Sequence, residues 1–188
     1  MLIRQETGPD FPQIYEFVKT AFQTAFVSGG TEQDYVNKIR SGGNYIPELS
    51  LVMIDDSDDG GAGSTTGKEA GGKIIGHIML SKIAIHGVSS MPKNMFEILL
   101  LAPVAIDADC RNKGLGSDLV KESLKRAKSE GYAAVILVGD PHYYERFGFV
   151  SAAKSGIKNK QNIPDENVLI LELVSGILEG ISGTVDFD

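Results

Sequence analysis

The 188-residue sequence contains a single cysteine, Cys110, and no tryptophan. One cysteine excludes an internal disulfide and a metal site built from several cysteines, and it suits a reducing compartment. Positive charge is also scarce, because 18 Lys and Arg residues oppose 25 Asp and Glu residues and leave a net charge of −7. A chain with this balance and no dense basic face is a poor candidate for binding nucleic acid through its phosphates.

Long apolar runs are absent as well. No segment approaches the roughly 20 apolar residues of a membrane span, and the first residues lack the basic and apolar regions of a secretory leader. We therefore predict a cytoplasmic protein with no membrane partner. With 42% hydrophobic residues, the chain can bury a core of its own, and residues 1–188 are expected to form a single domain.

Apolar runs typical of strands alternate along the chain with segments whose apolar residues have helical spacing. This alternation predicts an α/β fold, classed as α+β in some schemes. The predicted strands are 1–6, 48–55, 73–87, 96–107, 131–140, a short one opening at 149–150, and 168–174. The predicted helices are 12–22, 32–41, a third that begins near Gly114, and 142–148.

Residues 55–72 contain no large apolar side chain and are rich in Gly, Ser, Thr and Asp. This composition predicts a long, mobile hairpin loop. Its aspartates do not follow the spacing of a calcium-binding loop, so no metal site is expected. Residues 175–188 are expected to form a C-terminal tail.

The predicted strand 96–107 contains Pro103. Proline has no N–H to donate to a neighbouring strand, so a central strand that carries it must bulge or part from its neighbour there. The backbone groups left unpaired by such a splay can hold an extended ligand in place of a strand. An edge strand with an incidental proline is the alternative.

Residues 111–117, RNKGLGS, connect that strand to an amphipathic helix. Gly114 and Gly116 let the backbone approach an anion, and the helix directs its free amides and positive dipole end to the same place. Arg111 and Lys113 add positive charge. The pattern is neither a P-loop nor the three-glycine dinucleotide fingerprint, and it fits a pyrophosphate.

Two segments in this order, RNKGLG at 111–116 and YYERFGF at 143–149, resemble the signatures of the GCN5-related N-acetyltransferase (GNAT) superfamily. The similarity is greatest to its small stand-alone bacterial YhbS-like members. The resemblance implies a mixed central sheet of about seven strands with a V-shaped splay between the fourth and fifth, flanked by about four helices. It also implies an acetyl-CoA-dependent enzyme that moves an acetyl group directly to a primary amine.

The resemblance also implies which residues contact the cofactor. The backbone of Val104, Ala105 and Ile106 would hold the pantetheine arm. The pyrophosphate would be held by Arg111, Asn112, Lys113, Gly114, Leu115, Gly116 and Ser117. Further cofactor contacts would come from Gly139, Asp140, Tyr143 and Phe147, although the segment GDPH at 139–142 is shorter than the family's segment at this point.

Tyr144 stands at the position of the family's tyrosine and would protonate the departing CoA thiolate as general acid, with a packing role as the alternative. Glu97 is predicted to be the general base, with a solvated strand-end glutamate as the alternative. His77 is expected in the core or on the sheet surface, and His142 on a helix surface near the CoA. Cys110 is expected to be a small loop residue rather than a nucleophile.

Three functions remain open from the sequence: an N-acetyltransferase, a non-catalytic acyl-CoA-binding sensor or scaffold, and a nucleotide-phosphate binder. The splay favours the first two, because an extended pantetheine arm would use it and a bare nucleotide would not. The acceptor amine, on a small molecule or on a peptide or protein, is not specified. The acidic composition is compatible with aminoglycosides, polyamines and protein amino termini, and the family also allows a homodimer.

Overall fold

The computed structural model describes residues 1–24, 29–55 and 72–187. Contacts divide the chain into two compact units, one made of Met1–Met79 and Pro103–Ser123 and the other of Leu80–Ala102 and Leu124–Asp188. Strands β3 (Lys73–His86) and β4 (Met95–Ile106) and helix α3 (Leu115–Ser129) each contribute residues to both units. The predicted mobile loop at 55–72 lies, apart from its two end residues, outside the described residues.

The remaining strands are β1 (Leu2–Gln5), β2 (Tyr45–Asp55), β5 (Ala134–Val138), β6 (Val150–Ser151), β7 (Ile157–Asn159), β8 (Val168–Glu172) and β9 (Gly183–Val185). Together with β3 and β4 they form a nine-stranded mixed sheet in the order β1-β2-β3-β4-β5-β8-β6, in which β9 pairs with β3 and with β7. The α/β prediction is confirmed. The strand number exceeds the expected seven because β7 and β9, with three residues each, are too short to show periodicity.

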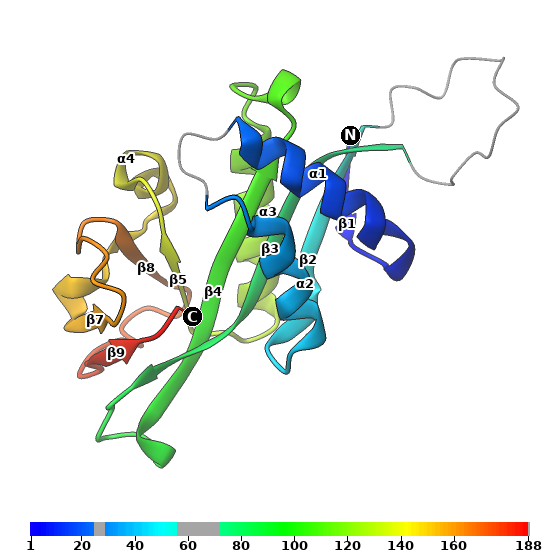
Figure 1. The fold of residues 1–188 in the computed structure, drawn as a ribbon. Coiled ribbons are helices and arrows are strands. Elements are labelled where there is room, and N and C mark those ends of the chain that lie inside the picture. The colour runs from blue at the N-terminus through cyan, green and yellow to red at the C-terminus, as the bar shows by residue number, and fades with distance from the viewer. Residues whose placement is uncertain (25–28, 56–71, 188) are drawn as a thin grey trace, which may run out of the picture. The chain divides into compact units, whose positions relative to one another are not determined.

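The helices are α1 (Phe11–Gln23), α2 (Glu32–Ser41), α3 and α4 (Pro141–Tyr144), as Figure 1 labels them. The predicted bounds of α2 agree with the structure, although Thr31 stands at its N-cap position without a side-chain hydrogen bond. Asp140 caps α4, because its side chain accepts from the His142 amide at 2.9 Å. The proline that follows it occupies the first helical turn, where no N–H is needed.

In the first unit, α1 and α2 pack against each other and cover one face of the strands, in front of β2 in Figure 1. Side chains of α1 at Ile14, Val18 and Ala21 form a buried cluster with alternate residues of β2, Val52 and Ile54. The two-residue period of a strand places these β2 side chains on one face and Met53 on the other.

The opposite face of the first unit receives the N-terminal half of α3. A side-chain carbon at Gly76 of β3 would lie 2.8 Å from Leu119 Cδ1, 3.1 Å from Ile106 Cδ1 and 3.1 Å from Met53 Cβ. The missing side chain at Gly76 therefore lets Leu119 of α3 approach the sheet closely.

In the second unit, β4 and β5 are parallel, with Leu99 paired to Val135 and Leu100 to Ile136. Both pairs precede Pro103, where the sequence predicted that the strands part. Strand β5 pairs with β8 in antiparallel fashion along all five of its residues. Strands β7 and β9 lie side by side (Figure 1), so the expected C-terminal tail at 175–188 is part of the sheet through β9.

No helix among the described residues is both long enough and apolar enough to cross a membrane.

Candidate functional site

The predicted anion loop, residues 111–117, lies in the first unit, follows β4 and includes the first three residues of α3. Asn112 and Gly114 have φ angles of 60° and 85°, so two left-handed residues occur within three positions. A side-chain carbon at Gly114 would meet nothing within 4 Å. The backbone over this glycine is therefore open, and its turn requires a residue that adopts positive φ without strain.

The loop leads directly into the first turn of α3. The amides of Ser117 and Asp118 both donate to the Gly114 carbonyl, at 2.9 and 3.1 Å. The amides of Leu115 and Gly116 precede these donors and belong to the first turn, whose N–H groups have no acceptor within the helix. Successive backbone amides of this kind, together with the positive end of the helix dipole, form a concave site for an anion.

The Arg111 side chain, which is predicted to add positive charge at the anion loop, contacts backbone carbonyls of the chain itself. Its guanidinium donates to three backbone carbonyls: Nη2 to Ala21 at 2.6 Å, Nη1 to Thr24 at 3.0 Å and Nε to Ile106 at 3.4 Å. The first two carbonyls are at the C-terminal end of α1. The exposed Lys113 remains the loop's second cation.

The predicted pantetheine residues are the last three residues of β4. Ala105 is buried in the α1 cluster, whereas Val104 and Ile106 are partly exposed. The next residue, Asp107, donates its amide to the Ile75 carbonyl at 2.9 Å, and its carboxylate pairs with Lys73 Nζ at 2.7 Å. The hydrogen bond from Lys73 lowers the pKa of Asp107. These contacts hold the strand end at the entrance of the loop.

Tyr144 lies in the second unit within a cluster of aromatic rings. Its ring centroid is 4.9 Å from that of Tyr143, 6.2 Å from that of Phe147 and 5.7 Å from that of Phe149. Burial, with a smaller contribution from Tyr143, raises the pKa of Tyr144 well above its ordinary value. The phenol therefore keeps its proton at neutral pH, as a proton donor must.

Gly139 has a specific role in placing this ring. A side-chain carbon at Gly139 would lie 2.5 Å from Tyr144 Cε2 and 3.0 Å from Tyr144 Cδ2. The Gly139 backbone is itself held on both sides, because its amide donates to Asn167 O at 2.9 Å and its carbonyl accepts from Asn167 Nδ2 at 3.1 Å. The tyrosine ring thus packs directly over a fixed stretch of backbone.

Glu97, the predicted general base, is a surface residue of β4 in the second unit. Its side chain is 52% exposed, and its Oε1 lies 3.5 Å from Lys82 Nζ. The geometry is that of a solvated ion pair, which is compatible with either of its predicted roles. His142 is exposed, and Cys110 is a partly buried free thiol beside the anion loop.

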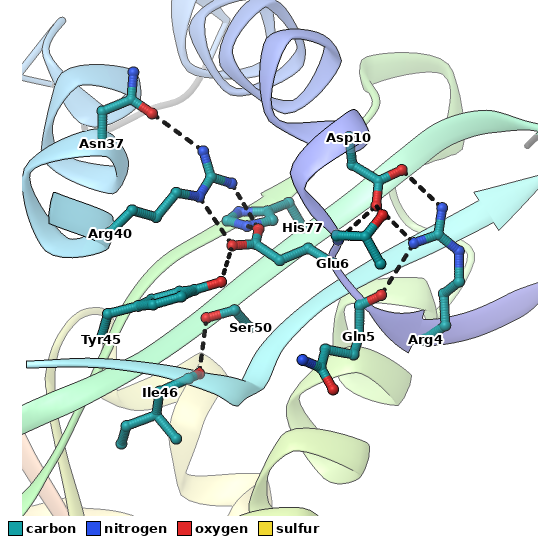
Figure 2. A network of polar contacts seen from close by, with 11 residues as sticks. Arg4, Gln5, Glu6, Asp10, Asn37, Arg40, Tyr45, Ile46, Ser50 and His77 are labelled. Carbon is teal, nitrogen blue, oxygen red and sulfur yellow. Dashed lines mark hydrogen bonds and ion pairs between the residues drawn. The ribbon is translucent and has the colours of Figure 1, made fainter.

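Sequence reasoning missed a buried polar cluster in the first unit (Figure 2). The Glu6 carboxylate accepts from Arg40 Nε at 2.9 Å and Nη2 at 2.6 Å, from the Tyr45 hydroxyl at 2.9 Å and from His77 Nε2 at 3.0 Å. Glu6 is 2% exposed and His77 is 0% exposed. A histidine inside the apolar strand at 73–87 was the one available signal, because a buried polar group requires a partner.

Comparisons with known proteins identify the family and the fold of this chain. The sequence profile of the acetyltransferase (GNAT) family matches residues 31–149. An uncharacterized N-acetyltransferase, YhbS of Escherichia coli strain K12, is 29% identical over 187 residues, which cover 100% of this chain and 96% of YhbS.

Two solved structures share the fold. The crystal structure of YhbS from Escherichia coli in complex with CoA matches with a TM-score of 0.80 and 28% identity, covering 100% of this chain and 89% of that one. A GNAT family acetyltransferase from Brucella melitensis in complex with acetyl-CoA matches with a TM-score of 0.73 and 23% identity, covering 100% of this chain and 95% of that one. The second match shows the common fold alone.

Proposed function

Because this chain belongs to the acetyltransferase (GNAT) family, we propose that it transfers an acetyl group from acetyl-CoA to a primary amine of a small molecule, a peptide or a protein. The observation that carries the proposal is the anion loop at 111–117. Asn112 and Gly114 are left-handed, and a side-chain carbon at Gly114 would meet nothing within 4 Å. They precede the first turn of α3, where amides have no acceptor within the helix.

In this proposal the pyrophosphate of acetyl-CoA binds the backbone amides of the loop, with Lys113 adding charge. The pantetheine arm binds the backbone of Val104, Ala105 and Ile106 as an added strand would, because Pro103 prevents regular pairing there. Gly139, Asp140, Tyr143 and Phe147 provide the remaining contacts with the cofactor.

The chemical step follows from the residues assigned to it. The neutral amine attacks the thioester carbonyl, a C–N bond forms, the C–S bond breaks and the sulfur leaves as a thiolate. Tyr144 gives its proton to the thiolate, and Glu97, directly or through water, takes the proton that the new amide nitrogen loses. Burial raises the pKa of Tyr144, so its hydroxyl still carries its proton when the thiolate departs.

Calorimetric titration with acetyl-CoA tests the binding site, and the chain offers a matched pair of variants. Gly114 and Gly131 have φ angles of 85° and 84°, and a side-chain carbon at either would meet nothing within 4 Å. Gly114→Ala and Gly131→Ala therefore introduce equal backbone strain, but only Gly114 lies in the loop. We expect Gly114→Ala to weaken acetyl-CoA binding and Gly131→Ala to leave it unchanged. Equal affinity in both variants would contradict the site, and no binding by the natural chain would overturn the function.

Turnover separates the enzyme from a non-catalytic acyl-CoA sensor. General acids contribute roughly 100-fold or more to a reaction rate. We expect Tyr144→Phe to lower kcat by about 100-fold, with acetyl-CoA affinity nearly unchanged, in a screen of primary amines followed by thiol release. A protein that binds acetyl-CoA but acetylates no amine, or acts equally well as Tyr144→Phe, would favour the sensor.

The remaining assignments extend this proposal. Bacterial relatives and a lone, unpaired cysteine support a place in a bacterial cytoplasm. Self-association as a homodimer remains a prediction from the family, and sedimentation of the purified protein measures it.

A further inference from the structure

Arg111 is the first residue of the anion loop, and its guanidinium is engaged by the protein's own backbone. Each of its three nitrogens donates to a different carbonyl, at Ala21, Thr24 and Ile106. The three acceptors come from two elements, the C-terminal end of α1 and the end of β4. The planar fork of arginine is the side-chain geometry that can serve separated acceptors at once.

The positive charge of Arg111 also lies at the negative end of the α1 dipole. The last carbonyls of a helix have no amide partner within the helix and carry the negative end of its dipole. Helix α1 ends at Gln23, and the amide of its C-cap residue Thr24 turns back to the Phe22 carbonyl. The carbonyls of Ala21 and Thr24 accept from the guanidinium instead, so Arg111 caps α1 from a distant part of the chain.

Because the Arg111 side chain is held in place, the backbone that follows it in the loop is held as well. Arg111 itself is extended, with φ −66° and ψ 161°, and left-handed Asn112 and Gly114 follow it. A shift of Arg111 would thus alter the direction in which the next amides point. The same side chain bonds Ile106, the last of the three strand residues assigned to the pantetheine arm.

We propose that Arg111 is a positioning residue for acetyl-CoA, because its guanidinium fastens the anion loop to the C-terminal turn of α1. This inference rests on the proposed function, since the ligand of the loop is taken to be acetyl-CoA. Acetyl-CoA binding to the loop and ordering of the last turn of α1 are then coupled. Each raises the equilibrium constant of the other by the same factor. Arg111 acts through the backbone that it holds, and the amides of the loop contact the phosphate.

Substitution by lysine distinguishes positioning from simple attraction. Lysine keeps the positive charge, but its single nitrogen cannot reach three separated carbonyls. We expect Arg111→Lys and Arg111→Gln to weaken acetyl-CoA binding by a similar factor of about tenfold, within the range typical of coupled sites. Lys121→Gln, an exposed lysine on the surface of α3, is the control and should bind as the natural chain does. An Arg111→Lys affinity within twofold of the natural chain would overturn the inference.

Two further measurements test the inference in other ways, and the second needs no variant. Millimolar guanidinium chloride should restore part of the affinity lost in Arg111→Ala, whereas methylammonium should not. In the natural chain, CoA should slow hydrogen exchange of the amides in the last turn of α1. Unchanged exchange there on saturation with CoA would overturn the coupling while leaving the acetyl-CoA site intact. Absence of any CoA binding by the natural chain would instead overturn the proposed function and the inference together.

Discussion

At the scale of single residues, the structure explains why a glycine precedes the tyrosine helix. Gly139 is predicted to contact the cofactor, and its surroundings show a further role within the protein. Tyr144 packs so closely over it that a side-chain carbon would overlap the ring. The position of the phenol thus depends on the smallest residue in the chain as well as on the neighbouring aromatic rings.

Gly139→Ala should displace the Tyr144 ring, because the added carbon would lie 2.5 Å from Cε2. We expect kcat to fall at least tenfold, since a shift of about 1 Å in a catalytic group can cost a factor of 100. Steady-state kinetics with acetyl-CoA and a competent amine measures this loss. Gly43→Ala is the control, because a side-chain carbon at Gly43 would meet nothing within 4 Å. An unchanged kcat in Gly139→Ala would mean that the ring position does not limit the reaction.

At the scale of elements, helix α2 is joined to the sheet by an apolar contact and an ionic one. Val36 and Ile39 of α2 pack on Met79 of β3. Beside them, the Arg40 side chain is 6% exposed and pairs with the fully buried carboxylate of Glu6, which follows β1. Figure 2 shows Arg40, Tyr45 and His77 converging on Glu6 from three different elements.

The protonation states of this cluster follow from its geometry. Burial alone would raise the pKa of Glu6, but hydrogen bonds from His77 and Arg40 outweigh it and lower the pKa to about 2. Burial lowers the pKa of His77 below its usual value. A neutral His77 beside an ionised Glu6 must carry its proton on Nε2. Its Nδ1 then holds a lone pair, and it has no hydrogen-bond partner among the described residues.

Stability should therefore fall in acid. Both pKa values are lower in the folded chain, so the unfolded chain binds more protons and the free energy of unfolding decreases as pH falls. The loss from His77 begins near pH 6.5, and that from Glu6 lies between pH 4.5 and about 2. Urea unfolding at a series of pH values measures this decrease. A free energy of unfolding that rises between pH 7 and pH 5 would contradict the assigned protonation states.

Glu6→Gln provides the matching mutational comparison. It leaves the Arg40 charge buried without a counter-charge, and we expect a loss of about 3 to 5 kcal/mol at pH 7. Glu16→Gln is the control, because its carboxylate is 67% exposed and lies 3.7 Å from Lys19. Such exposed pairs contribute little to stability. Equal stability of the two variants would mean that the cluster contributes no more than a surface ion pair.

At the scale of the whole molecule, the last residues of the chain complete the second unit. Strand β9 pairs with β3 through Ile85 and Val185, and with β7 through Ile157 and Gly183. Asp186 then accepts from Lys160 at 2.9 Å and from Gln161 at 2.7 Å. The C-terminal segment is therefore an internal part of the sheet, and it protects the edges of two other strands.

Substitutions of two valines, one in β9 and one on the surface, test how much β9 contributes to stability. Val185 is 0% exposed, whereas Val174 is 48% exposed. We expect Val185→Ala to lower the free energy of unfolding by about 1 to 3 kcal/mol through lost burial and a residual cavity. Val174→Ala should change it by less than about 0.5 kcal/mol. Chemical denaturation of both variants provides the comparison, and equal stabilities would show that β9 is not needed to hold the unit together.

The sequence by itself determined the features that are written within one short segment. Local spacing and backbone preference predict several features. These are the bounds of α2, the cap of α4, the glycine loop that leads into α3 and the effect of Pro103 on the pairing of β4. A helix period, a cap or a left-handed turn depends on neighbours a few residues away, so a linear pattern can carry it. The two motifs at 111–116 and 143–149 led to the family for the same reason.

Only the tertiary structure decided which distant groups meet. The motif predicts a positive charge at Arg111, and only the structure shows that its guanidinium donates to the Ala21 and Thr24 carbonyls. The Glu6 cluster unites positions 6, 40, 45 and 77, and no local period links them. A buried polar side chain must find a partner, and any acceptor that folding brings within about 3 Å can provide it. The choice among those acceptors is made by packing in three dimensions, which the order of residues along the chain does not display.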